Sequence, residues 1–187
     1  LDACLAAVGQ AAAPRRVRLL VSADGARAEA APAEVGPRFP FDLDSVPRRV
    51  CLDLQPSVHS GDRLLGHKTL WRSAYDEARR RTLGEGTDMF DVVMYNERGE
   101  VTETSIANIA VEDEVGWRTP PLFCGLLPGV MRAHLLETTK VHEGVVTVDQ
   151  LVAASAAGRR LLCFNSVRGA YLVALAVEPR LGLRPIG

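Results

Sequence analysis

Apolar and polar residues alternate along several short segments of this 187-residue chain, which is the pattern of half-buried strands. Residues 16–22 and 27–31 flank the turn-forming Ala23-Asp24-Gly25, and this arrangement predicts a β-hairpin. The Ala- and Leu-rich residues 1–9 are typical of the end of a helix. Together these segments predict that residues 1–36 are the end of an element separate from the main domain.

A proline-rich stretch follows this first part of the chain. Residues 31–56 carry five prolines and few periodic apolar positions, so they predict a linker with one short strand near residues 49–54. We therefore expect a linker and first strand over residues 37–57, followed by a larger domain over residues 58–187.

The larger domain alternates between helical and strand-like patterns. Residues 69–83 and 129–140 have the spacing of amphipathic helices, and a further helix is expected over residues 149–157, capped by Asp149 and ended by Gly158. Strands are predicted over residues 91–95, 101–111, 145–148, 161–164 and 171–177. This order predicts an α/β (α+β) fold with a mixed sheet and flanking helices.

The composition is that of an ordinary globular protein, with 47% hydrophobic and 24% charged residues. The formal net charge of −1 argues against a nucleic-acid partner. The run Arg79-Arg80-Arg81 lies on a predicted helix, where we expect a solvated face rather than a polyanion site. No apolar run approaches the length that crosses a bilayer, so no membrane partner is expected.

The cysteines and histidines carry neither a disulfide nor a metal signature. The four cysteines form no CxxC pair, and the histidines lack the spacing of metal ligands, so we expect no metal site. Cys51 and Cys163 lie in apolar, strand-like runs, which favours buried thiols in a reducing, cytoplasmic setting.

Lys68 and Glu103 are candidate functional residues. A lysine that condenses with an aldehyde needs a partly desolvated amine, and Lys68 lies where a loop leads into a helix, which fits a buried position. Glu103 lies among strand residues, where a buried carboxylate needs a cationic partner such as a protonated ring nitrogen. Each residue also fits an ordinary surface position. Asn108 could face the same site or satisfy backbone groups in a loop.

Two further segments could bind an anion. Pro128 and Gly129 start a predicted helix, whose first amides, those of Val130 and Met131, favour a phosphate. Many helices start this way without a ligand. After the next apolar strand, Ser166 could add a hydroxyl to this site, and Arg168 could pair with a substrate carboxylate or form a surface salt bridge.

The order of these motifs resembles the class IV aminotransferase family, the fold-type IV pyridoxal phosphate enzymes. The segments that carry the resemblance are His67-Lys68-Thr69, Asn96 to Thr104, Gly125 to Arg132 and Asn165-Ser166-Val167-Arg168-Gly169. Within the family the first and last segments are most similar to aminodeoxychorismate lyase-like domains.

The resemblance implies pyridoxal 5'-phosphate as cofactor and a role for each motif residue. Lys68 would be the Schiff-base lysine and general acid/base, and Glu103 the partner of the pyridine nitrogen. The Val130 and Met131 amides and the Ser166 hydroxyl would bind the phosphate, and Arg168 a substrate carboxylate. The implied protein is a homodimer with a small-molecule substrate that carries amino and carboxylate groups. Such lyase-like domains occur alone, or fused to or paired with aminodeoxychorismate synthase.

The reaction implied by this resemblance is the elimination of pyruvate from 4-amino-4-deoxychorismate to give 4-aminobenzoate, a folate precursor. An aminotransferase acting on branched-chain or D-amino acids would use the same residues and is the alternative. An alternative of another class is a non-catalytic remnant of the fold or an inactive fragment. The family's small N-terminal domain supplies a phosphate-binding arginine. The resemblance implies that residues 1–36 are the C-terminal remnant of this smaller α/β domain, and most of the domain is expected to be missing here.

Three aromatic residues depart from the family pattern. Trp71 stands where many members carry an asparagine, and it either packs against the cofactor or belongs to the core. The tyrosine that some members place beside the cofactor's phenolic oxygen lies closer to the lysine than Tyr75 does. Tyr95 is an alternative with no motif around it.

Overall fold

The computed structural model describes residues 13–32, 46–84 and 86–176, together with residues 2, 6, 8 and 9. The chain divides into two compact units, Leu1–Arg38 and Phe39–Gly187. The helix end predicted over residues 1–9 lies mostly outside the described residues.

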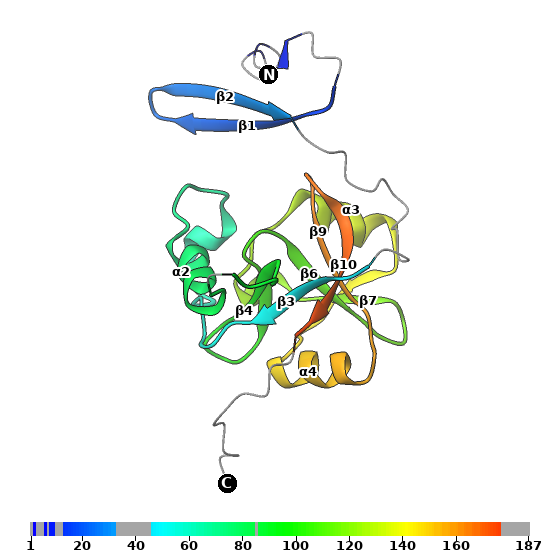
Figure 1. The fold of residues 1–187 in the computed structure, drawn as a ribbon. Helices are drawn as coiled ribbons and strands as arrows, with labels where there is room; N and C mark the ends of the chain where they lie inside the picture. Colours follow the sequence, from blue (N-terminus) through cyan, green and yellow to red (C-terminus); the bar gives the residue numbers. More distant parts are fainter. Residues whose placement is uncertain are drawn as a thin grey trace. The chain divides into compact units, whose positions relative to one another are not determined.

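The first unit contains an antiparallel hairpin of β1 (Arg15–Ser22) and β2 (Gly25–Pro32) (Figure 1). Gly25 has φ 137°, a conformation that other residues rarely adopt, so the predicted turn depends on this glycine. The predicted hairpin is confirmed.

The second unit is built on an eight-stranded mixed sheet with the strand order β5-β4-β3-β10-β9-β6-β7-β8. Its strands are β3 (Arg48–Leu52), β4 (Asp91–Tyr95), β5 (Val101–Thr104), β6 (Asn108–Glu112), β7 (Trp117–Thr119), β8 (Val141–Glu143), β9 (Leu161–Asn165) and β10 (Gly169–Leu175). β3 is parallel to both β4 and β10, and β7 is parallel to β8, while the other pairs are antiparallel. The predicted mixed sheet is confirmed.

Helices flank this sheet, as the sequence predicts. They are the 3-10 helices η1 (Arg63–Gly66) and η2 (Leu122–Cys124) and the α-helices α2 (Ser73–Thr82), α3 (Val130–Thr138) and α4 (Val148–Ala156). α2 packs against β4, α3 against β9, and α4 against β6 and β10 (Figure 1).

The prediction for residues 145–149 was wrong at two points. Thr147, rather than Asp149, caps α4: its hydroxyl accepts from the Gln150 amide, and the Gln150 side chain accepts from the Thr147 amide. Residues 145–147 form only an isolated bridge between Thr147 and Glu100 in place of a strand. The strand that precedes α4 is β8, which ends at Glu143. Gly158, the predicted end of the helix, follows α4 and has a φ of 74°.

The single strand predicted over residues 101–111 is two strands joined by a tight turn. The Thr104 amide donates to the Ala107 carbonyl at 2.8 Å, and the Thr104 hydroxyl bonds both backbone groups of Ala107 at 3.0 Å. Because this turn reverses the chain, the edge strand β5 lies back against β6, which is five places away in the strand order. The turn thus brings Glu103 and Asn108 together.

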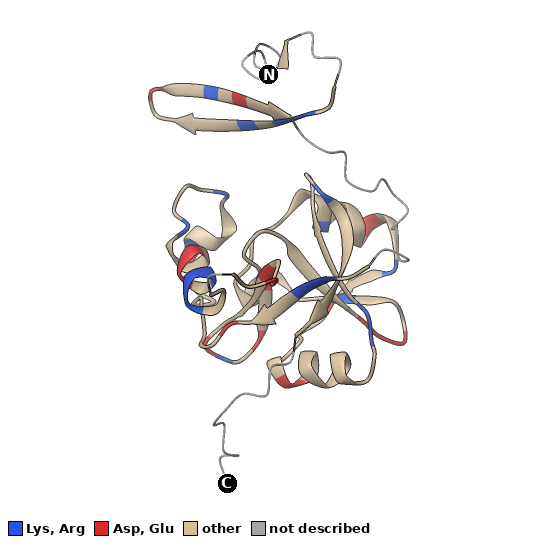
Figure 2. Cartoon of the chain, viewed as in Figure 1, with Lys and Arg blue, Asp and Glu red and all other residues tan. Residues whose placement is uncertain are grey.

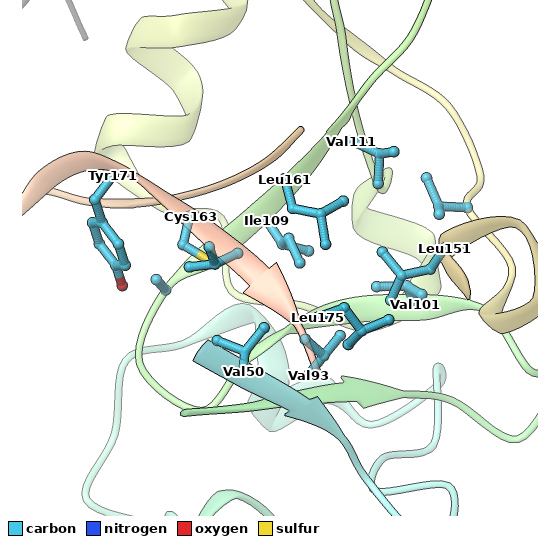
Figure 3. Close-up of a cluster of buried hydrophobic side chains, with 13 residues drawn as sticks. Val50, Val93, Val101, Ile109, Val111, Leu151, Leu161, Cys163, Tyr171 and Leu175 are labelled. Atoms are coloured by element: carbon cyan, nitrogen blue, oxygen red, sulfur yellow. The ribbon is translucent and has the colours of Figure 1, made fainter. Parts of the chain in front are cut away.

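The largest hydrophobic cluster lies among β3, β4, β6, β9, β10 and α4 (Figure 3). Residues in this cluster include Val50, Val93, Val101, Ile109, Val111, Leu151, Leu161, Cys163, Tyr171 and Leu175. Fully burying an aliphatic side chain of this size stabilises a fold by about 1.5–3 kcal/mol. Cys163 contributes to this apolar packing as a buried free thiol.

Two buried carboxylates anchor α2 and correct the expectation for the arginine run. Asp53 is fully buried and accepts two hydrogen bonds from the Arg81 guanidinium, and the nearly buried Asp91 accepts one from Arg79 at 2.7 Å. The prediction of a solvated face is therefore wrong for Arg79 and Arg81, because each arginine pairs with the negative charge of a carboxylate removed from water. Arg80 is exposed, and basic and acidic residues occur together on α2 (Figure 2).

Removing Arg81 should be far more costly than removing its neighbour. Arg81→Ala leaves the Asp53 carboxylate buried without its main cation, which should lower the free energy of unfolding by about 3 kcal/mol. Arg80→Ala should change it by no more than about 0.5 kcal/mol, since it alters an exposed side chain. Urea denaturation of both variants measures this difference. Equal losses would contradict the anchoring of α2 by Asp53.

Candidate functional site

Glu103 lies at the point where four segments of the second unit meet. It is a residue of β5 and only 5% of its surface is exposed. Its Oε1 accepts hydrogen bonds from the Tyr75 hydroxyl at 2.8 Å and from the Leu127 amide at 3.0 Å. Its Oε2 accepts from Asn108 Nδ2 at 3.1 Å. The predicted carboxylate is therefore an inward-facing group rather than an outward-facing strand acid.

Burial dominates the electrostatics of this carboxylate. It raises the pKa of Glu103 to about 7, against the hydrogen bonds from Leu127 and Tyr75 and the positive charges of Lys68 and Arg72, all of which lower the pKa. A carboxylate in this state gains most from a further cation, because its own donors do not fully offset its desolvation.

Lys68 lies in the connection between η1 and α2, close enough to Glu103 for its charge to lower the pKa of that carboxyl. We predicted a partly buried position for Lys68, and this prediction is wrong, because residues 67–71 are all exposed. The connection lies at the surface, where its backbone groups can bond water. The helix before this connection, η1, is capped by Asp62, whose side chain accepts from the Leu64 amide at 2.9 Å.

The start of α3 leaves backbone amides unpaired within the helix. The Ala133 amide donates to the Gly129 carbonyl at 3.0 Å, and Gly129 as N-cap offers no side chain. The amides of Val130 and Met131 therefore lie at an open helix N-terminus, as the sequence predicted. The Val130 side chain is 78% exposed, so the packing does not require a valine there.

Asn108 joins this helix start to Glu103. Its Nδ2 donates both to Glu103 Oε2 and to the Leu127 carbonyl, the latter at 3.0 Å, so both interpretations of this residue are correct. A Cβ atom at Gly129 would overlap Asn108 Oδ1. Because the two hydrogen bonds of its Nδ2 hold Asn108 in place, a side chain at position 129 would push against this amide.

Ser166 and Arg168 lie in the turn between β9 and β10. Asn165 shapes this turn, because its Oδ1 accepts from the amides of Val167 and Arg168 at 3.0 and 2.8 Å. The Arg168 guanidinium lies 5.9 Å from the centroid of the Phe90 ring. Ser166 is exposed, and the roles predicted for both residues remain predictions.

The start of α3 and the end of β9 contribute to one apolar cluster. Met131 packs against a cluster that contains Phe164, the residue before Asn165. The start of α3 therefore packs near the end of β9, and an anion site shared with Ser166 stays a prediction.

The three aromatic residues that depart from the family pattern lie in different environments. Trp71 is 71% exposed, so it does not belong to the core. Tyr75 lies on α2 and bonds Glu103, whereas Tyr95 is the last residue of β4. Sequence reasoning missed this contact of Tyr75, although a tyrosine on the buried side of a helix needs a partner for its hydroxyl.

Sequence reasoning also missed Arg72 and the Leu127 amide. Arg72 Nη2 donates to the Ser105 carbonyl at 2.8 Å, and its guanidinium lies 4.9 Å from the Tyr75 ring centroid. No sequence signal points to the Leu127 amide, since any residue other than proline supplies the same N–H group there.

Among the described residues, no helix is long and apolar enough to cross a membrane.

Comparison with known proteins places these residues in a family. Residues 1–175 match the sequence pattern of the amino-transferase class IV family. The chain belongs to the class IV aminotransferase family. The predicted resemblance is confirmed, and members of this family are enzymes that use pyridoxal phosphate.

Individual relatives agree with this placement. A provisionally assigned aminodeoxychorismate lyase of Schizosaccharomyces pombe is 36% identical over 140 residues, which are 73% of this chain and 59% of that protein. The chain thus spans less than two thirds of this relative's length. A provisionally assigned amino-acid aminotransferase structure from Mesorhizobium loti is 33% identical with a TM-score of 0.80, covering 94% of this chain and 79% of that one.

A more distant structure shares the fold alone. The provisionally assigned branched-chain amino acid aminotransferase of Thermotoga maritima has a TM-score of 0.69 at 23% identity, over 89% of this chain and 58% of that one. It supports the fold-type IV α/β architecture predicted from the sequence.

The residues present fit the family's cofactor. Glu103 is a buried carboxylate with a raised pKa, which suits a protonated ring nitrogen. The start of α3 suits a phosphate, because no side chain at the Gly129 N-cap occupies its free amides. Lys68 supplies an amine whose positive charge lowers the pKa of Glu103.

Glu103→Gln should change how stability depends on pH in the cofactor-free protein. The folded pKa of about 7 lies above the ordinary value of 4.5, so the folded state binds more protons than the unfolded state between these values. The wild type should therefore lose about 3 kcal/mol relative to Glu103→Gln as pH rises from 4.5 to 8.

Urea denaturation at several pH values measures this difference. Glu77→Gln removes an exposed carboxyl from the same unit and controls for the loss of one charge. Parallel pH dependences of the wild type and Glu103→Gln would contradict the burial of this carboxyl.

Gly129→Ala should be destabilising only while Asn108 is present. The added methyl overlaps Asn108 Oδ1, so we expect a loss of about 1–3 kcal/mol in the free energy of unfolding. In an Asn108→Ala background the same change should cost no more than about 0.5 kcal/mol, because the overlapping atom is gone. A double-mutant cycle followed by urea denaturation measures the coupling, and additive effects would contradict the close approach.

Proposed function

We propose that this chain is the cofactor-binding part of a pyridoxal phosphate-dependent 4-amino-4-deoxychorismate lyase. Such an enzyme releases pyruvate from its substrate and forms 4-aminobenzoate. The observation that carries the proposal is the network at Glu103, where a buried carboxylate, the Lys68 charge and the start of α3 come together. The 36% identity to the Schizosaccharomyces pombe relative supports the lyase over other reactions of the family.

In this proposal the cofactor is held at three points. Lys68 would bond its aldehyde carbon, Glu103 its ring nitrogen, and the Val130 and Met131 amides its phosphate, with Ser166 as a further phosphate ligand. The two amides favour an anion because they lie at the positive end of the α3 dipole. When bound, the cofactor supplies a ring that accepts the negative charge left by bond breaking in the substrate.

Lys68 would also move the proton in the reaction. When its amine is not bound to the cofactor, Lys68 would accept and return a proton close to the reacting carbon. Lys68 lies shortly before α2, where its positive charge lowers the pKa of Glu103. Arg168 would orient a substrate carboxylate through paired N–H groups, with its guanidinium lying near the Phe90 ring.

An aminotransferase is the second candidate. The Mesorhizobium loti structure, which is described as an amino-acid aminotransferase, is 33% identical and matches nearly the whole chain. The transfer of an amino group to a 2-oxo acid would use Lys68, Glu103 and the start of α3 in the same roles. The two candidates therefore differ in the groups that contact the rest of the substrate.

The proposal includes a setting for the complete protein. We expect a cytoplasmic homodimer in folate biosynthesis that is fused to or paired with aminodeoxychorismate synthase. Residues 1–36 would belong to a smaller domain, residues 37–57 would form the linker and first strand, and residues 58–187 would form the cofactor domain. The thiols Cys124 and Cys163 are free and buried, which is compatible with a reducing compartment.

Cofactor binding tests the first part of the proposal. The purified chain with added pyridoxal phosphate should show a visible absorbance band that Lys68→Ala lacks, because the band requires a covalent bond to this amine. Lys140→Ala provides a control, since Lys140 directly follows the α3 C-cap and lies at the opposite end of that helix from the amide site. An equal band in wild type and Lys68→Ala would overturn the cofactor role of Lys68.

Product analysis then separates the candidates. A lyase converts 4-amino-4-deoxychorismate to equal amounts of 4-aminobenzoate and pyruvate, without a 2-oxo acid in the reaction. Amino transfer from a branched-chain or D-amino acid, dependent on added 2-oxo acid, would instead support the aminotransferase. A lysine-dependent band with neither activity would support a non-catalytic remnant of the fold.

A further inference from the structure

Tyr75 is a hydroxyl donor to Glu103 that the family pattern does not explain. Its OH lies 2.8 Å from Glu103 Oε1, and its ring lies beneath the Arg72 guanidinium at 4.9 Å. Its helix, α2, is anchored to the sheet by the ion pairs of Arg79 with Asp91 and of Arg81 with Asp53. Tyr75 therefore approaches Glu103 from a fixed element rather than from a loop.

The two oxygens of Glu103 are bonded unequally. Oε1 accepts from both Tyr75 and the Leu127 amide, whereas Oε2 accepts only from Asn108 among the residues that the structure describes. A carboxylate oxygen has about two acceptor positions. Oε1 is therefore filled, and Oε2 keeps one position for another donor.

We infer that Tyr75 is a positioning residue for the cofactor's ring nitrogen: by filling Oε1 it makes Glu103 present an ionised Oε2 to that nitrogen. This inference rests on the proposed cofactor role of the site. It goes beyond that role because it names the group that sets the orientation and charge of the nitrogen's partner.

The charged groups around the pair favour this division of roles. Lys68 and Arg72 both lower the pKa of Glu103, so they support its ionised form. Burial first, and then the charge of Glu103, raise the pKa of Tyr75, with a smaller contribution from Asp62. Tyr75 thus keeps its proton at neutral pH and remains a donor.

A packing role for Tyr75 makes a different prediction. Its ring packs against the apolar cluster that includes Met94 and Ala78, and phenylalanine would keep these contacts. Tyr75→Phe also keeps the ring beneath Arg72. The hydroxyl alone is removed, so its effect on Glu103 can be separated from its effect on packing.

The first measurement is the titration of the Glu103 carboxyl by ¹³C NMR in the cofactor-free chain, assigned with Glu103→Gln. Loss of one hydrogen bond to a carboxylate corresponds to about one pKa unit, so Tyr75→Phe should raise the Glu103 midpoint by about one unit. Glu77→Gln, an exposed change on α2, should leave the midpoint in place. An unchanged midpoint in Tyr75→Phe would overturn the inference.

The second measurement is the affinity for pyridoxal phosphate as a function of pH. Tyr75→Phe should bind several-fold more weakly near neutral pH, with a pH profile displaced upward, because more of Glu103 is protonated. In a Glu103→Gln background the same change should have no effect on the profile. Wild-type binding with an unchanged Tyr75→Phe profile would overturn the inference alone. No Lys68-dependent binding by the wild type would overturn the proposed function and this inference with it.

Discussion

Burial of the Glu103 carboxylate is the constraint on which the site depends. A carboxyl removed from water must be protonated, hydrogen-bonded or paired with a cation, and Glu103 has donors from α2, β6 and the segment before α3. Each donor fixes the element that carries it. The same contacts that hold the carboxylate therefore align the lysine segment, the turn between β5 and β6, and the helix start, and they leave one acceptor position of Oε2 available for a cation.

The same requirement explains the rest of α2. Asp53 and Asp91 are buried acids that are held by Arg81 and Arg79, so the helix is fixed to β4 and to the end of β3 by charge as well as by apolar packing. Because α2 is fixed, Tyr75 meets Glu103 at a defined distance. Three buried carboxylates thus connect the stability of the unit with the geometry of its candidate site, and a change far from Lys68, such as at Arg81, is expected to affect both.

The sequence predicted what local patterns determine. The strands around Asp91 and Leu161 and the open start of α3 follow from alternation and turn residues. The inward position of Glu103 was implied by the family resemblance, because the strand pattern alone also fits an outward-facing acid. It did not predict contacts that depend on how distant elements pack. The approach of Tyr75 to Glu103 and the pairing of the arginine run with Asp53 and Asp91 require knowledge of which face of α2 meets the sheet. The Thr147 cap was mistaken for a strand because a short apolar run fits either structure.

The central claim is that Glu103 is the ionised partner of the cofactor's ring nitrogen. The most direct measurement is ¹⁵N NMR of pyridoxal phosphate labelled at that nitrogen and bound to the wild type and to Glu103→Gln. The account predicts a protonated nitrogen in the wild type across neutral pH and an unprotonated one in Glu103→Gln, since an amide cannot stabilise the positive charge. The same protonation state in both proteins would contradict it.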